Sequence, residues 1–185
     1  MSTAKTALPG FSSPAAGFEA PLEMLSACHG RVERQCETLL RLLPHLAANG
    51  PDQAAREAAQ NVMRYFDTSA RHHHADEEQD LFPALLLSAP AAELAPLREL
   101  IDTLQAQHRE LEQVWGALRR TLAGISEGTV RELDATEVRR LADLYRSHIA
   151  REEAELLPFA ARILSIDQLD GVGRAMRERR GIKEL

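Results

Sequence analysis

The chain has 185 residues, a formal net charge of −6 and 44% hydrophobic residues. A chain of this size can bury one hydrophobic core without help from disulfide bonds, so we expect a single domain. Its lysines and arginines are scattered and do not form the basic stripe of a nucleic-acid-binding protein. Since no segment is long and apolar enough to cross a membrane, we expect neither nucleic acid nor a membrane as a partner.

The cysteines and the first residues indicate where the protein works. Cys28 and Cys36 would lie about 12 Å apart on one helix, at roughly 1.5 Å per residue, which is too far for a disulfide bond. Free thiols are typical of a reducing cytosol, so we expect a cytoplasmic protein. Residues 1–18 are rich in Ala, Ser, Pro and Gly and lack the apolar run of a signal peptide, which predicts a flexible tail.

Helix-favouring residues dominate the sequence after the tail. Ala, Leu, Glu, Arg and Gln are frequent from Pro21 onward, whereas aromatic residues are few. The first predicted helix covers residues 21–48, and Asn49-Gly50-Pro51 is its stop signal. Pro44 predicts either a kink in this helix or an earlier end.

Two further helices follow from caps and breakers. Asp52 is placed to cap a second helix that continues past a run of histidines to about Pro83, and residues 88–92 read as a connection. A third helix is predicted from about Ala95 to Gly124.

The last two helices each begin with the pattern of a capping box. Asp134 with Glu137 predicts the start of a fourth helix, and Ser165 with Gln168 predicts the start of a shorter fifth helix. The fifth helix is expected to end in a basic run before Gly181.

Each of the four long helices carries one histidine on its apolar stripe. Apolar residues spaced three and four apart mark the side of a helix that faces the core. The histidines that fall on these stripes are His29, His73, His108 and His148. Four helices are thus predicted to direct one imidazole each into the core.

A motif repeated in the second and fourth helices relates the two halves of the chain. Residues 73–83 and 148–158 align without a gap in the pattern His-x-x-x-Glu-Glu-x-x-Leu-x-Pro. This repeat indicates two helix hairpins related by a pseudo-twofold axis. We therefore predict an all-α, up-down-up-down four-helix bundle over residues 19–164, with a short C-terminal helix over residues 165–185.

The spacing of the repeat suits metal binding. Residues four apart share one face of a helix, so His73 with Glu77, and His148 with Glu152, can each direct a nitrogen and an oxygen to one point. With the other two histidines, four imidazoles and two carboxylates divide into two metal positions that share both glutamates. Without a metal, these buried groups would cost on the order of 10 kcal/mol, which rivals the roughly 5–15 kcal/mol stability of a domain.

The donor types suit iron. Nitrogen and carboxylate ligands without thiolate favour iron, although manganese or zinc could use the same donors. Four protein ligands per metal and an oxo or hydroxo bridge would leave one position open on each ion. That position predicts a small ligand, namely dioxygen, nitric oxide or peroxide.

These motifs resemble the hemerythrin-like HHE cation-binding domain, a four-helix bundle with a non-haem di-iron centre. The resemblance covers roughly Pro21 to Arg162 and is carried by the segments 22–29, 72–83, 107–108 and 148–158. Carried over residue by residue, it implies these ligands of two iron ions: His29, His73, Glu77, His108, His148 and Glu152.

The chain departs from the oxygen-carrying hemerythrins at two places. Those proteins use a fifth histidine four residues after the third-helix ligand, where this chain has Glu112, and a fourth-helix His-x4-Asp pair, where this chain has His-x3-Glu. The resemblance is closer to members that handle nitric oxide, sense oxygen or iron, or repair damaged iron centres.

Some neighbours of the predicted ligands have two readings. A slip of one residue would make His74 and Glu78 a ligand pair in place of His73 and Glu77; otherwise His74 lies beside the site or is exposed. Glu33 and Glu112 follow His29 and His108 by four residues, either as partners of the ligands, as ligands in some state of the metal, or as surface residues.

Tyr145 could hydrogen-bond a bound diatomic or simply pack in the core. The basic residues of the last helix are interpreted as a solvated helix end that complements the dipole: Arg174, Arg177, Arg179 and Arg180.

The predicted function is a non-haem di-iron protein that binds or reacts with dioxygen, nitric oxide or peroxide, in sensing, scavenging or iron-centre repair. A di-iron oxidase, peroxidase or nitric oxide reductase is the enzymatic alternative, but no flavin or nicotinamide motif identifies an electron source, so the redox partner stays open. A third reading is a bundle that uses metal only structurally. Both a monomer and a homodimer fit the sequence.

Overall fold

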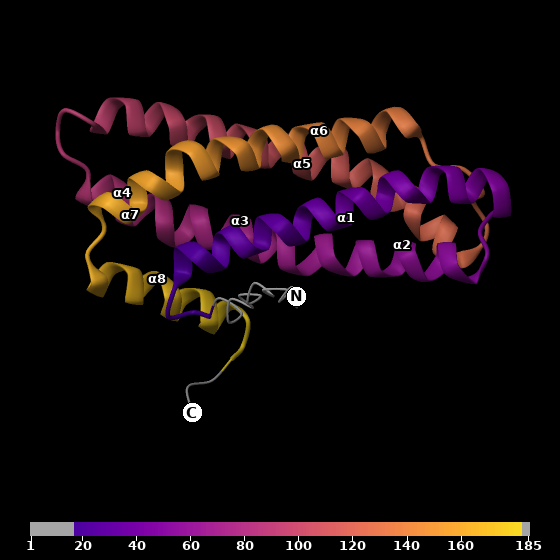
Figure 1. The fold of residues 1–185 in the computed structure, drawn as a ribbon, viewed down its shortest axis with the longest axis horizontal. Coiled ribbons are helices and arrows are strands. Elements are labelled where there is room, and N and C mark those ends of the chain that lie inside the picture. The colour runs from indigo at the N-terminus through magenta and orange to yellow at the C-terminus, as the bar shows by residue number, and fades with distance from the viewer. Residues whose placement is uncertain (1–16, 183–185) are drawn as a thin grey trace, which may run out of the picture.

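Five helical rods make up the computed structural model, which describes residues 17–182. Four rods run up, down, up and down as a bundle, and the fifth lies against one end of it (Figure 1). The first rod is α1 (Pro21–Asn49), the third is α5 (Leu94–Glu127) and the fifth is α8 (Ile166–Arg179). No strand is found in the described part of the chain, which confirms the predicted all-α bundle.

The second and fourth rods are each interrupted by π-helical turns. The second rod consists of α2 (Gln53–Tyr65), η1 (Phe66–Ala70), α3 (Arg71–Asp76), η2 (Glu77–Leu81) and α4 (Phe82–Ser88). The fourth rod consists of α6 (Ala135–Arg151), η3 (Glu152–Leu156) and α7 (Leu157–Ile163).

Local chemistry explains most of the helix ends. Asp52 caps α2 by accepting a hydrogen bond from the backbone N–H of Ala55, and Ser165 with Gln168 forms the predicted capping box of α8. α1 passes through Pro44 and ends at Asn49, where Gly50 takes a positive φ of 67°. The predicted stop signal is therefore confirmed, and an earlier end at Pro44 is excluded.

The predicted end of the third helix at Gly124 is wrong. α5 continues to Glu127 and is terminated by Gly128, which adopts the left-handed conformation with a φ of 79°. Gly124 is needed for packing, because a Cβ there would lie 2.4 Å from the side chain of Val130 in the returning loop. A glycine can thus lie within a helix because the following loop leaves no room for a side chain.

A polar layer divides the hydrophobic core into two clusters. One cluster extends toward the helix ends at Leu46 and Ile125, and the other extends toward Leu85 and Leu97. Each of the four long rods contributes to both clusters. Between the two clusters lie the buried histidines and glutamates of the repeated motif. The bundle therefore encloses these polar groups with apolar side chains above and below.

α8 packs against α1, α3 and η2 at the end of the bundle where the rods of the repeat finish (Figure 1). Phe18, which precedes α1, packs against the core cluster on this side. Its backbone lies so close to α8 that a Cβ on Gly173 would be 2.0 Å from the carbonyl oxygen of Phe18. The rest of the predicted tail, residues 1–16, lies outside the described residues.

The prediction of a solvated helix end is wrong for two of the C-terminal arginines. Arg179 and Arg180 have side chains that are only 17% and 16% exposed, and both pair with Asp76, which is fully buried in α3. The contact between Arg180 Nη2 and Asp76 Oδ2 is 2.6 Å long. The prediction considered only the dipole of α8, whereas packing of α8 on α3 brings these cations over a buried carboxylate. Arg174 is exposed, as predicted.

Within residues 17–182, no helix has both the length and the hydropathy that a membrane span requires.

Candidate metal centre

Four imidazoles and two carboxylates meet in the polar layer of the core. The six side chains come from all four rods of the bundle, and each is at most 4% exposed. They are the six ligands predicted from the sequence: His29, His73, Glu77, His108, His148 and Glu152. The structure thus brings the whole predicted set together at one depth.

Glu152 receives imidazoles from three rods. Its Oε2 lies 3.0 Å from Nε2 of His29, and its Oε1 lies 3.1 Å from Nε2 of His148. The same Oε1 lies 3.9 Å from Nε2 of His108. Its two oxygens therefore face different histidines, as a carboxylate shared between two metal ions must.

Glu77 occupies the corresponding place in the other half. Its Oε1 lies 3.6 Å from Nε2 of His73, and its Oε2 lies 3.3 Å from Nε2 of His108. Both carboxylates thus divide their oxygens between imidazoles of different rods.

Two groups of four donor atoms share these carboxylates. One group contains His29 and His73 with both glutamates, and the other contains His108 and His148 with both glutamates. Within each group, the donor atoms lie within 4.8 Å of one another. This division reproduces the predicted arrangement of two histidines for each metal position and two shared carboxylates.

Several atoms at the centre lack a hydrogen-bond partner among the described residues. They include His29 Nε2, His73 Nδ1 and both oxygens of Glu77 and Glu152. Burial of a polar atom in this state costs about 1–3 kcal/mol, and more when it is charged. One cation held within each group would bind the nitrogens and oxygens of that group, so the donor set fits a pair of metal ions.

The pKa values show how strongly the metal-free centre needs positive charge. Burial and the neighbouring Glu152 raise the pKa of Glu77 to about 8. Burial would also raise the pKa of Glu152, but the close imidazoles of His108, His148 and His29 hold it well below its usual range. One carboxylate is therefore ionised and surrounded by imidazoles, whereas the other is easily protonated.

The histidines divide in a similar way. Burial opposes the charged form of His29 and His108, yet contacts with the carboxylates outweigh it and raise their pKa values to about 9 and about 10. Burial lowers the pKa of His73 to about 3. Protons on two imidazoles thus balance the carboxylates in the metal-free protein, and bound cations would replace those protons.

Comparison with known families agrees with this geometry. The family model described as "Hemerythrin HHE cation binding domain" matches residues 20–160. The chain belongs to this family. It is also 36% identical over 169 residues to an uncharacterized protein of Haemophilus influenzae (strain ATCC 51907 / DSM 11121 / KW20 / Rd), an alignment that covers 91% of this chain and 95% of that protein.

In this hemerythrin HHE domain, a second glutamate beside each shared glutamate orients a histidine of another rod. Glu153 Oε1 lies 2.6 Å from Nδ1 of His29, and Glu78 Oε1 lies 2.7 Å from Nδ1 of His108. Occupation of Nδ1 leaves Nε2 of each ring directed at the centre. The apolar stripes of the helices did not predict this role for Glu78 and Glu153, although the repeated Glu-Glu pair was an available signal.

Gln107 orients the histidine of the fourth rod in the same way, because its Oε1 lies 3.1 Å from Nδ1 of His148.

The π-helical turns place the shared glutamates of the domain. Glu77 opens η2 and accepts a hydrogen bond from the N–H of Phe82, five residues later. Glu152 opens η3 and accepts the matching bond from Leu157. A proline follows in both rods, and because it has no N–H it cannot continue the regular ladder of an α-helix. The repeated Leu-x-Pro is thus the sequence signal of a widened turn of the kind often found at functional sites.

His74 and Glu78 do not form the ligand pair that a slip of one residue would make, because no donor group of the described residues contains both. Glu78 contacts His108 Nδ1, while Glu77 faces the centre. Glu33 is exposed, and Glu112 forms an ion pair with Arg71 at 3.1 Å in which both side chains are about two-thirds exposed. Neither belongs to a metal-binding group within the described residues.

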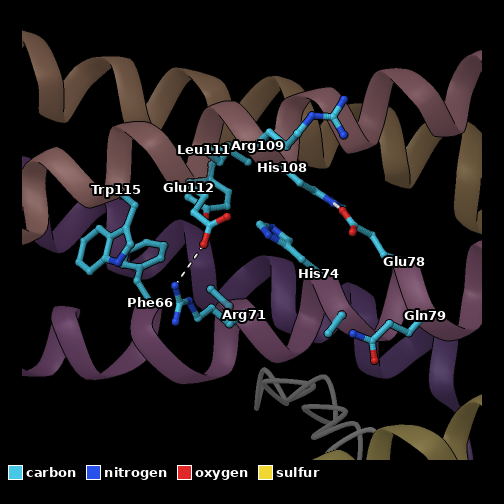
Figure 2. Close-up of a pocket in the computed structure, with 13 residues that line it drawn as sticks. Phe66, Arg71, His74, Glu78, Gln79, His108, Arg109, Leu111, Glu112 and Trp115 are labelled. Carbon is cyan, nitrogen blue, oxygen red and sulfur yellow. Dashed lines mark hydrogen bonds and ion pairs between the residues drawn. The ribbon is translucent and has the colours of Figure 1, made fainter.

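A cavity of about 390 Å³ opens beside the centre. Figure 2 shows His74 and His108 close together on its wall, with the Arg71–Glu112 ion pair nearby. Tyr145 also lines the cavity; it is buried, with its ring 5.5 Å from that of Phe66. The domain thus has space for a small molecule next to one of its two donor groups.

Proposed function

We propose that this HHE domain holds a pair of iron ions, joined by an oxo or hydroxo bridge, and uses them to bind or react with dioxygen, nitric oxide or peroxide. The observation that carries the proposal is the two donor groups that share Glu77 and Glu152 in a buried layer of the core. Nitrogen and carboxylate donors without thiolate favour iron over softer metals.

Each residue of the centre has a distinct task in this proposal. Glu77 and Glu152 would bridge the two metal positions, with His29 and His73 on one position and His108 and His148 on the other. When bound, the iron pair supplies open coordination positions and changes of oxidation state. Glu78, Glu153 and Gln107 hold three of the imidazoles in the orientation that binding requires.

The cavity supports a small ligand over a purely structural metal site. A closed structural site needs no adjoining space, whereas here a cavity of about 390 Å³ reaches His108. Sensing, scavenging and iron-centre repair are the roles that such a ligand would serve. Cys28 and Cys36 are both buried free thiols, which fits a reducing compartment, and we include a cytoplasmic location in the proposal.

Metal analysis of protein expressed without added metal, together with an optical spectrum, tests the proposal. We expect two iron ions per chain and the absorption bands of a coupled di-ferric pair, which shift when azide or nitric oxide is added. Iron-loaded protein whose visible spectrum does not respond to either molecule would contradict ligand binding. Protein that takes up neither iron nor manganese would contradict the metal centre itself.

A further inference from the structure

A fifth imidazole, that of His74, lies against only one of the two donor groups, the one that contains His108 and His148. His74 belongs to α3, directly after His73, and its ring stacks on that of His108 with centroids 4.0 Å apart and planes inclined by 13°. One ring nitrogen of His74 lies within 4.8 Å of ring nitrogens of His108 and His148. These three histidines thus form a further donor group that overlaps the second metal position.

The free nitrogen of this ring points to a ligand. His74 Nε2 is buried and has no hydrogen-bond partner among residues 17–182. The rings around it, His108, His148 and Tyr145, lie at centroid distances of 4.0, 5.9 and 6.3 Å. A buried imidazole nitrogen in this state is costly unless a cation or a bound molecule reaches it.

The pseudo-twofold repeat shows that this imidazole belongs to one half alone. Residue 149 corresponds to His74 in the alignment of the two motifs, and it is Ile149, which packs in the hydrophobic core. Glu112 could have reached the same side from α5, but it pairs with Arg71 (Figure 2). His74 is therefore the additional donor that the chain directs to this position.

We propose that His74 is a ligand of the metal ion held by His108 and His148, so that one ion is bound by three imidazoles and the other by two. This inference rests on the proposed metal pair. The resulting asymmetry leaves the ion bound by His29 and His73 with fewer protein ligands than its neighbour. The two ions would then differ in their affinity for the protein and in their spectra.

The variant His74→Phe tests this assignment, because it keeps a ring of similar shape and removes both nitrogens. His72→Phe is the matched control, since His72 is the neighbouring histidine, is half-buried and belongs to no donor group in the described residues. We expect the Mössbauer spectrum of the native di-iron protein to show two unequal iron sites, and the two to become more alike in His74→Phe. The affinity for the ion held by His108 and His148 should fall by about tenfold or more.

His74→Ala gives a second, independent measurement, because it leaves a space beside the cavity that free imidazole can enter. Isotopically labelled imidazole should restore the native spectrum and show a magnetic coupling between its nitrogen and the iron in the mixed-valent protein. Circular dichroism of the metal-free variants checks that each one folds.

The possible failures are distinguishable. If the native protein binds no metal pair, the proposed function fails. If the native protein binds the pair and His74→Phe leaves the Mössbauer spectrum and metal affinity unchanged, only the assignment of His74 fails. An unchanged metal spectrum with altered azide or nitric oxide binding would also overturn it, and would place His74 against the bound small molecule.

Discussion

The two halves of the bundle share one motif but differ in what surrounds it. In both halves, a histidine and a glutamate one turn later face the centre, and the next glutamate holds a histidine of another rod. At position 74 the first half has a histidine, where the second has Ile149. At position 76 it has a buried aspartate, where the second has the partly exposed Arg151.

This difference shows how a repeat can supply a symmetric donor set and still make an asymmetric site. The shared residues determine where metal ions can be held. The residues that differ determine which side faces the cavity and which side α8 holds in place.

The largest effect is expected from loss of a shared carboxylate. Glu152→Ala removes an oxygen donor from both groups and leaves three imidazoles without their common partner. We expect the variant to lose the metal pair, as measured by metal content after reconstitution with ferrous iron. Glu33→Ala is the control, because Glu33 also follows a core histidine by four residues but is exposed. Full metal content in Glu152→Ala would contradict a bridging role.

Asp76→Ala should give the largest change in stability among the residues that differ between the halves. Asp76 is fully buried and pairs with two arginines. Breaking a buried ion pair typically costs roughly 3–5 kcal/mol, and because both arginines are partly exposed we expect a loss of about 2–3 kcal/mol. Arg151→Ala, at the corresponding position of the fourth rod, should cost less than about 0.5 kcal/mol. Urea unfolding of the metal-free proteins measures both values, and equal losses would contradict a specific role for α8.

Loss of an orienting glutamate should weaken metal binding without abolishing it. Glu78→Ala and Glu153→Ala each free one Nδ1 of a histidine, and changes of this kind reduce metal affinity by about 10–100-fold. Because the two contacts are related by the repeat, the reductions should be similar. Competition with a chelator gives the affinities. A large effect of one variant with none of the other would show that the halves differ here as well.

The stability of the metal-free protein should fall as the pH rises. Folding raises the pKa of His29 from 6.5 to about 9 and that of Glu77 from 4.5 to about 8. Groups with raised pKa values stabilise the fold while protonated, and this contribution is lost as the pH rises through the folded values. We expect the Tm of the metal-free protein to fall most steeply between about pH 6.5 and 8, where both groups lose their contribution, and to go on falling to about pH 9 as His29 deprotonates. The Tm of the metal-loaded protein should change less over that range. A constant Tm without metal would contradict proton balancing at the centre.

Much of the fold was predictable because the relevant signals are local. Asp52, the Ser165–Gln168 pair and the Asn49-Gly50-Pro51 stop lie where the structure places helix ends. The wrong end at Gly124 arose because glycine usually breaks a helix, whereas here it makes room for Val130. The wrong environment of Arg179 and Arg180 arose because their partner lies about a hundred residues earlier, in α3.

The candidate site was predictable to a similar extent. The apolar stripe of each helix and the repeated motif predicted the six donors, and the structure places them in one layer. Glu78 and Glu153 were missed because each acts on a histidine of another rod, which leaves no periodic signal within its own helix. The place of His74 stayed open because a regular helix turns it by about 100° from His73, so periodicity alone does not direct both inward.

The most direct test of the centre is crystallography of protein prepared with iron, with anomalous scattering recorded at the iron absorption edge. We predict two anomalous peaks in the polar layer, one beside His29 and His73 and the other beside His108 and His148. The carboxylates of Glu77 and Glu152 should contact both ions. A single peak, or iron bound outside this layer, would contradict the shared-carboxylate arrangement.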